Sequence, residues 1–98
     1  MNLQALMKQA QSMQKNIMDS KKKIESMIFE GQSELVEVKI NGKREVLSVK
    51  IKNATLEKDD IEILEDMIVI AMNDALNKVN KEIEDKMGSQ AGALSSFL

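Results

Sequence analysis

The longest wholly apolar stretch of this 98-residue chain is Met67-Ile68-Val69-Ile70-Ala71-Met72. It lies in a segment without Gly or Pro that runs to about Met87 and is predicted to be a helix. At about 100° per residue, the stretch covers about 600° of helical rotation and is apolar on every side. Since a surface helix shows a single apolar stripe, this one is predicted to be buried all round. Asp59, with Glu62 in capping-box spacing, is predicted to begin the helix, and Gly88 to end it.

Two segments before this helix alternate between apolar and polar residues, which predicts strands. The first is Leu35–Asn41, with Val36, Val38 and Ile40 on one face. The second is about Val46–Lys52, with Leu47, Val49 and Ile51 facing inward.

The dipeptide Asn41-Gly42 between these strands predicts a hairpin with a type I′ turn, which needs positive φ at both residues. A two-residue loop would oppose Val38 to Glu45, and a four-residue loop would oppose it to Leu47. Ile28–Glu30 is expected to add a short third strand.

The N-terminal segment, Asn2 to Ile28, predicts one long helix that Asn2 caps. Seven of its eight heptad a and d positions are apolar, which indicates a helix–helix seam. The a positions are Leu3, Ala10, Ile17 and Ile24, the d positions are Leu6, Met13, Ser20 and Met27, and Met7 and Ile28 widen the stripe at e.

At about 1.5 Å per residue, each long helix should extend about 40 Å. A compact domain of this length has a radius of gyration of only about 13 Å, so the helices are too long to fit within it. Their ends must project or contact another chain, so we expect a homodimer with projecting helices. Its interface is predicted at Met67, Ile68, Val69, Ile70 and Met72.

The composition argues against an enzyme, because the chain contains no His and no Cys. We expect no cofactor and no bound metal, since the acidic residues at 57–66 do not have EF-hand spacing and are explained by helix capping. Residues 1–52 carry ten basic and six acidic residues, whereas residues 53–98 carry four and ten. This asymmetry indicates either a charged partner for the basic half or attraction between the halves. No signal peptide or membrane span is expected, and we predict a cytoplasmic protein.

Four stretches together resemble the YbaB/EbfC family of bacterial nucleoid-associated, DNA-binding proteins. They are Leu6-Met7-Lys8-Gln9-Ala10-Gln11-Ser12-Met13-Gln14, Val38-Lys39-Ile40-Asn41-Gly42, the segment from Leu64 to Ala75, and Lys86-Met87. The resemblance implies an α+β fold of order α-β-β-β-α and a tweezer-like homodimer whose projecting helices contact DNA. One domain is expected at residues 1–88, followed by a flexible tail at 89–98.

The candidate DNA-binding residues are lysines on the two helices. Lys8, Lys15 and Lys22 fall at heptad position f, about 10.5 Å apart, where they can follow phosphates. The other candidates are Lys21 and Lys23 on the first helix and Lys78, Lys81 and Lys86 on the second. The alternative is that these lysines only form a solvated face. It is favoured for the sheet residues Lys39, Lys43, Arg44, Lys50 and Lys52, and surface ion pairs with Glu82, Glu84 and Asp85 are favoured for the three lysines of the second helix.

With one Arg and two Phe, the chain has few groups for reading guanine or stacking on bases. The sequence therefore favours double-stranded DNA, bound through phosphates with little or no base-specific readout. A prefoldin-like protein-interaction module, or an adaptor with no direct DNA role, remains an alternative.

Overall fold

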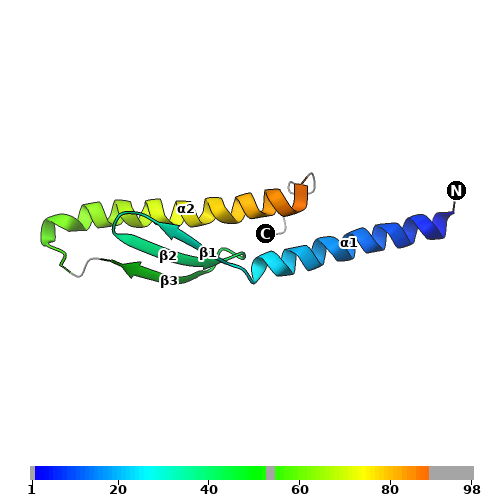
Figure 1. The fold of residues 1–98 in the computed structure, drawn as a ribbon, viewed down its shortest axis with the longest axis horizontal. Coiled ribbons are helices and arrows are strands. Elements are labelled where there is room, and N and C mark those ends of the chain that lie inside the picture. Colours follow the sequence, from blue (N-terminus) through cyan, green and yellow to red (C-terminus); the bar gives the residue numbers. More distant parts are fainter. Residues whose placement is uncertain (1, 53–54, 89–98) are drawn as a thin grey trace.

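The computed structural model describes residues 2–52 and 55–88. In chain order its elements are helix α1 (Leu3–Glu25), strands β1 (Ile28–Gln32), β2 (Val36–Asn41) and β3 (Val46–Ile51), the 3₁₀ turn η1 (Lys58–Asp60) and helix α2 (Ile61–Met87). The strands form one antiparallel sheet in the order β1-β2-β3. The predicted α-β-β-β-α order is thus confirmed, including the short first strand (Figure 1). The predicted tail at 89–98 lies outside the described residues.

Helix α2 lies along one face of the sheet, over β1 and β2 (Figure 1). The two layers are in close contact at Gly31, where an added Cβ would collide with the carbonyl oxygen of Ala71 and lie 2.8 Å from the Cβ of Ala75. Small residues on both sides therefore let strand and helix backbones approach. At the end of the same strand, Gln32 N–H donates to Asp74 Oδ2 at 2.9 Å.

The core lies between α2 and the strands, with Ile24 of α1 at one end. Its α2 residues repeat every four positions: Ala71, Ala75, Val79, Ile83 and Met87. Facing them are Phe29, Val36, Val38 and Ile40. The stretch predicted to be buried all round is covered on one side only within the chain, since Val69 is 57% and Ile70 54% exposed.

Helix α1 contacts the body only near the helix's C-terminal end, and its N-terminal part projects well beyond the sheet (Figure 1). The molecule measures 71 × 18 × 16 Å and has a radius of gyration of 18.9 Å, against about 13 Å for a compact domain of this length. The two helices do not pair along their lengths, because only the C-terminal part of α1 packs near α2, which differs from a prefoldin-like arm. The helix ends at Glu25 rather than Ile28, because Ile28 pairs with Asn41 in the sheet.

The hairpin between β2 and β3 differs from both predicted registers. Arg44 N–H donates to the Asn41 carbonyl oxygen at 3.0 Å, and Arg44 has φ 66°, whereas neither Asn41 nor Gly42 has positive φ. The loop is therefore a turn over Asn41–Arg44 ending in a left-handed residue, not a type I′ turn. The Asn41 side chain stabilises it by accepting from Lys43 N–H at 2.9 Å and Glu45 N–H at 3.0 Å.

A bulge after this loop changes the register again. The pairing shifts between Lys39 and Ile40, so Val38 faces Val49. The predicted common face of Val38 and Val49 is correct, but Val46 rather than Leu47 pairs with Ile40 on this face. The predicted burial of β3 is wrong within this chain, because all six of its residues are exposed.

The helix starts are also only partly as predicted. Asn2 caps α1, its Oδ1 accepting from Gln4 N–H at 3.0 Å. Asp59 does not cap α2, because the chain makes the turn η1 first. There, Glu57 N–H donates to Asp60 Oδ2 at 2.9 Å, and α2 begins at Ile61. Gly88 ends α2 as predicted, with φ 53°.

We predict that Gly31→Ala lowers the free energy of unfolding by about 3 kcal/mol, because the new methyl group would collide with the α2 backbone. Urea unfolding at a fixed protein concentration measures the change. Gln11→Ala, at an exposed position of α1, should change stability by less than about 0.5 kcal/mol. Equal midpoints for the Gly31 variant and the parent would contradict the close contact.

Candidate nucleic-acid interface

The projecting part of α1 carries a row of exposed lysines. Lys8, Lys15 and Lys22 are each seven residues apart and exposed, so their Cα atoms are about 10.5 Å apart along the axis. An α-helix drifts by about 20° per heptad, which keeps the three on one side. Among the described residues, none of these three ammonium groups has an ion-pair or hydrogen-bond partner. The row is therefore available to an external anion.

The two neighbouring candidates on α1 are less alike. Lys21 is half-buried. Lys23 is exposed and lines a shallow groove between the end of α1 and the end of α2, together with Glu82 and Lys86. Of these two, Lys23 is the better placed to extend the row.

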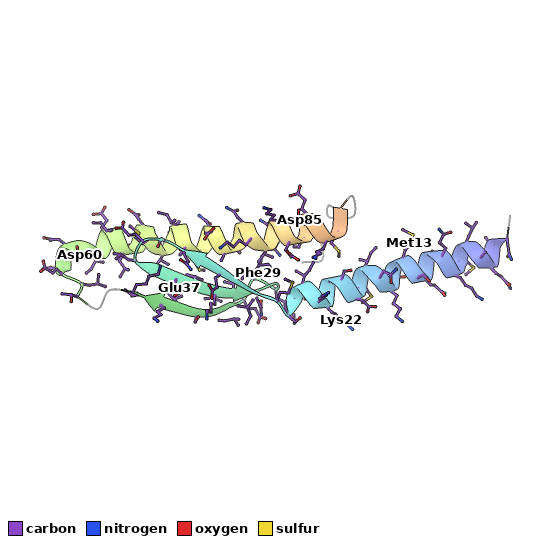
Figure 2. All side chains as sticks on the ribbon, in the orientation of Figure 1. Met13, Lys22, Phe29, Glu37, Asp60 and Asp85 are labelled. Carbon is purple, nitrogen blue, oxygen red and sulfur yellow. The ribbon has the colours of Figure 1, made fainter. Side chains whose placement is uncertain are left out.

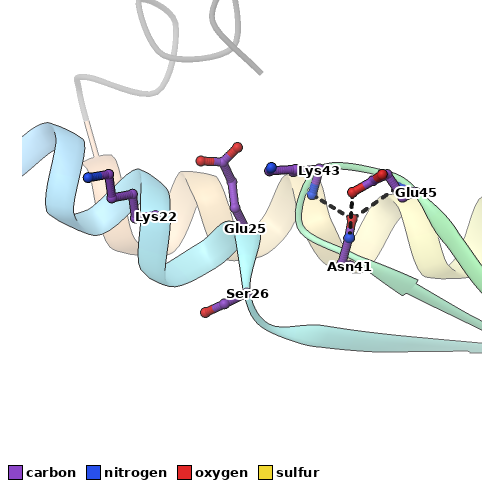
Figure 3. A pocket seen from close by; sticks show the side chains of 6 residues that line it. All are labelled: Lys22, Glu25, Ser26, Asn41, Lys43 and Glu45. Atoms are coloured by element: carbon purple, nitrogen blue, oxygen red, sulfur yellow. Dashed lines mark hydrogen bonds between the residues drawn. The ribbon is translucent and has the colours of Figure 1, made fainter.

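The arm is held to the sheet where the hairpin loop meets the last turn of α1. Ile24 is 2% exposed, and a Cβ on Gly42 would collide with the Ile24 carbonyl oxygen. Gly42 is thus needed for space at this joint, not for a positive φ. Lys22, Glu25, Lys43 and Glu45 border an open hollow beside the joint (Figure 3). Their charges cancel, so the hollow itself is not an anion site.

The candidate lysines of α2 are mostly engaged within the chain. Lys78 Nζ donates to the Glu30 carbonyl oxygen at 2.7 Å and lies 3.6 Å from Asp74 Oδ2. Lys86 Nζ lies 3.9 Å from Glu82 Oε1. Lys81 is exposed, beside Glu82 and Asp85. These three amines lie among acids, whereas on α1 only Asp19 and Glu25 lie within four residues of Lys15 or Lys22, and no acid lies within four residues of Lys8.

The basic residues of the sheet are divided in the same way. Lys39 pairs with Glu30 on the neighbouring strand at 3.6 Å, and Lys52 Nζ donates to the Ser33 carbonyl oxygen at 3.3 Å. The only Arg of the chain, Arg44, donates to Asn80 Oδ1 at 2.7 Å. Lys43 and Lys50 are exposed. The sheet therefore offers isolated amines rather than a continuous basic surface.

The acidic residues at 57–66 lie at the end of the molecule opposite to the arm. Figure 2 shows Asp60 at that end, with Met13 and Lys22 along the projecting helix. Attraction between these acids and the arm within one chain is thus ruled out by distance. No group of acidic residues in the described part of the chain is arranged to hold a metal ion. Nor is any helix within these described residues long and apolar enough to cross a membrane.

The sequence did not reveal one exposed surface, which is apolar. The face of β3 that continues the buried face of β2 is open to solvent, because α2 covers only β1 and β2. We call this surface the open body face; it consists of Val46, Val49 and Ile51. Alternation showed which strand residues share a face, but not how far α2 reaches.

A small α+β body with a projecting lysine-bearing helix is suited to an extended polyanion rather than to a small ligand in a pocket. The sequence model of the YbaB/EbfC DNA-binding family matches residues 1–94, and the chain belongs to this family.

Relatives in several bacteria are similar along nearly the whole chain. A nucleoid-associated protein of Lactococcus lactis subsp. lactis (strain IL1403) is 41% identical over 90 residues, which is 90% of this chain and 91% of that protein. One from Streptococcus thermophilus (strain CNRZ 1066) is 38% identical over 96 residues, 96% of this chain and 97% of that protein. Another, from Ligilactobacillus salivarius (strain UCC118), is 34% identical over 90 residues, 90% of this chain and 86% of that protein.

Proposed function

We propose that this protein is a cytoplasmic, nucleoid-associated homodimer that binds duplex DNA through phosphate contacts from the lysines of α1. Membership of a DNA-binding family supports the DNA partner, and relatives are named nucleoid-associated proteins. The observation that carries the choice of residues is that Lys8, Lys15 and Lys22 have no partner in the described part of the chain and lie on a helix that stands away from the body.

The row on α1 is favoured over the lysines of α2 because a phosphate has to replace fewer existing interactions at the α1 amines. A phosphate that approaches Lys8 or Lys15 displaces only water and counterions. At Lys78 it must compete with a hydrogen bond and a carboxylate. Lys81 and Lys86 would bind beside Glu82, which repels phosphate. The lysines of α2 therefore contribute less, and Lys23 extends the row on α1.

The side chains available for contact with DNA also indicate that this protein reads base sequence little or not at all. The guanidinium of Arg44, the one group suited to bidentate guanine recognition, is engaged with Asn80. Phe29 is buried, so it cannot stack on bases. Lysines on one helix face can position the protein on a duplex but carry no sequence information.

The homodimer is supported by the open body face. Its side chains are about half exposed, although Val49 and Val38 share the face that is buried at Val38. Burying such a face against its copy is the commonest solution for a two-fold dimer. The proposed interface combines β3 with the predicted residues of α2, Met67, Ile68, Val69, Ile70 and Met72. Two copies double the lysine rows, which matters because each chain has a net charge of −2.

We predict that affinity for duplex DNA falls with salt and that the triple variant Lys8→Ala, Lys15→Ala, Lys22→Ala binds more weakly. The slope of log affinity against log salt should become shallower by up to about 0.9 for each phosphate that the variant no longer neutralises. Fluorescence anisotropy at several salt concentrations measures both quantities.

The matched control for this test removes three exposed lysines elsewhere: Lys43→Ala, Lys50→Ala, Lys58→Ala. It has the same net charge as the triple variant, and its slope should stay close to that of the wild type. Equal slopes for the α1 variant and the wild type would place the phosphate contacts off this helix. Absence of binding at low salt would contradict the proposal altogether.

A second prediction concerns the dimer. The wild type should sediment with at least twice the chain mass of 11.0 kDa, and Val49→Glu should shift it toward the single chain by burying a charge in the interface. Ser48→Glu adds the same charge to the opposite face of β3 and should leave the mass unchanged. A wild type that sediments as one chain would refute the dimer, and equal masses for the two variants would move its interface.

A further inference from the structure

Among residues 2–52 and 55–88, the apolar seam of α1 has no partner along its projecting part. Leu3 is 71% exposed and Met13 50%, and Leu6, Met7 and Ala10 between them are exposed as well. No described element of the chain reaches them (Figure 1). A helix of this length is marginal in water without an apolar face to pack, so the projecting part requires a contact. We call these five residues the arm seam.

The spacing of the arm seam specifies the kind of surface that covers it. Leu3, Leu6, Ala10 and Met13 follow the 3.5-residue repeat that fits one helix against another, not against a sheet or a DNA groove. The same line of residues continues through Ile17 and Ile24, which pack into the body beside the end of α2. The seam is therefore already used for packing where a partner is in reach.

The charges around the arm seam allow another copy of α1 as its partner. Lys8 and Lys15 are the only charged residues among residues 3–16, and both lie at position f, away from the seam. The flanking e and g positions hold Met7, Gln14, Gln9 and Asn16. Charged residues at e and g often determine which helices pair. Since these positions are uncharged here, two copies of α1 can pair without repulsion between like charges.

Helix α2 of another copy fits less well. The exposed side of its C-terminal half carries Lys81, Glu84 and Asp85, and its apolar line from Ala71 to Met87 is already buried in its own body. An α1 helix, by contrast, offers a seam of the same length and period.

We propose that the arm seam pairs with the arm seam of a second copy, forming a short coiled coil. This contact is distinct from the open body face and from DNA binding. It leaves the lysine row on the outer side of each helix. Two paired arms therefore present two lysine rows on opposite sides of one rod, which suits a protein that holds two duplex segments together.

The chain contains no Cys, so a single introduced thiol reports this contact. Ala10→Cys lies midway along the arm seam and close to its counterpart in either helix orientation. A short bismaleimide should link this variant efficiently into two-chain products. Ser12→Cys, at the outward position c, should link poorly although it reacts with a monofunctional maleimide.

Adding Leu6→Glu to the Ala10→Cys variant should lower the yield of linked product roughly tenfold or more, because a pair buries two copies of Leu6. Gln11→Glu adds the same charge at position b and should leave the yield unchanged. Circular dichroism of each variant verifies that the body stays folded.

Two results would overturn the pairing. One is Ala10→Cys reacting with the monofunctional reagent but not linking, which would leave the seam to a helix of another protein. The other is equal linking with Leu6→Glu and Gln11→Glu. Neither result bears on DNA affinity, which is measured in a separate titration.

Discussion

Helix α2 packs on the apolar face of β1 and β2, so this part of the sheet is not available to the second long helix, α1. Gly31 permits this packing, because its missing side chain lets β1 lie directly on Ala71 and Ala75 of α2. Helix α1 packs on the body mainly through Ile24, which lies between the end of α2 and the loop at Gly42. The rest of α1 must project. The 71 Å length of the molecule, the exposed lysine row and the exposed seam all follow from this projection of α1.

The projecting helix separates two kinds of chemistry on opposite sides. Its a and d positions are apolar, its f positions are lysines, and its remaining positions up to Asn16 carry no charge. Phosphate binding and helix pairing therefore do not compete for the same side chains. On the body, the acidic residues at 57–66 lie at the end opposite to the arm. A negatively charged chain can thus still expose a basic element where a polyanion could reach it.

The sequence predicted the features that depend on local periodicity, such as both helices, the strand faces and the order of elements. It did not predict those that depend on how far one element reaches over another. Alternation placed Val49 on the same face as Val38, but the sequence could not show that α2 stops short of β3. Asn41-Gly42 marked the turn correctly, yet Gly42 is required by contact with Ile24, and the left-handed residue is Arg44. The exposure of Lys8 and Lys78 was equally predictable, but the hydrogen bond from Lys78 to Glu30 depends on tertiary packing.

The claim on which the account rests is that α1 extends away from the body in solution. Small-angle X-ray scattering tests it directly. The account predicts a maximum dimension of at least 71 Å and a radius of gyration of at least 18.9 Å. A compact particle, with a radius of gyration of about 13 Å for one chain or about 16 Å for two, would contradict it.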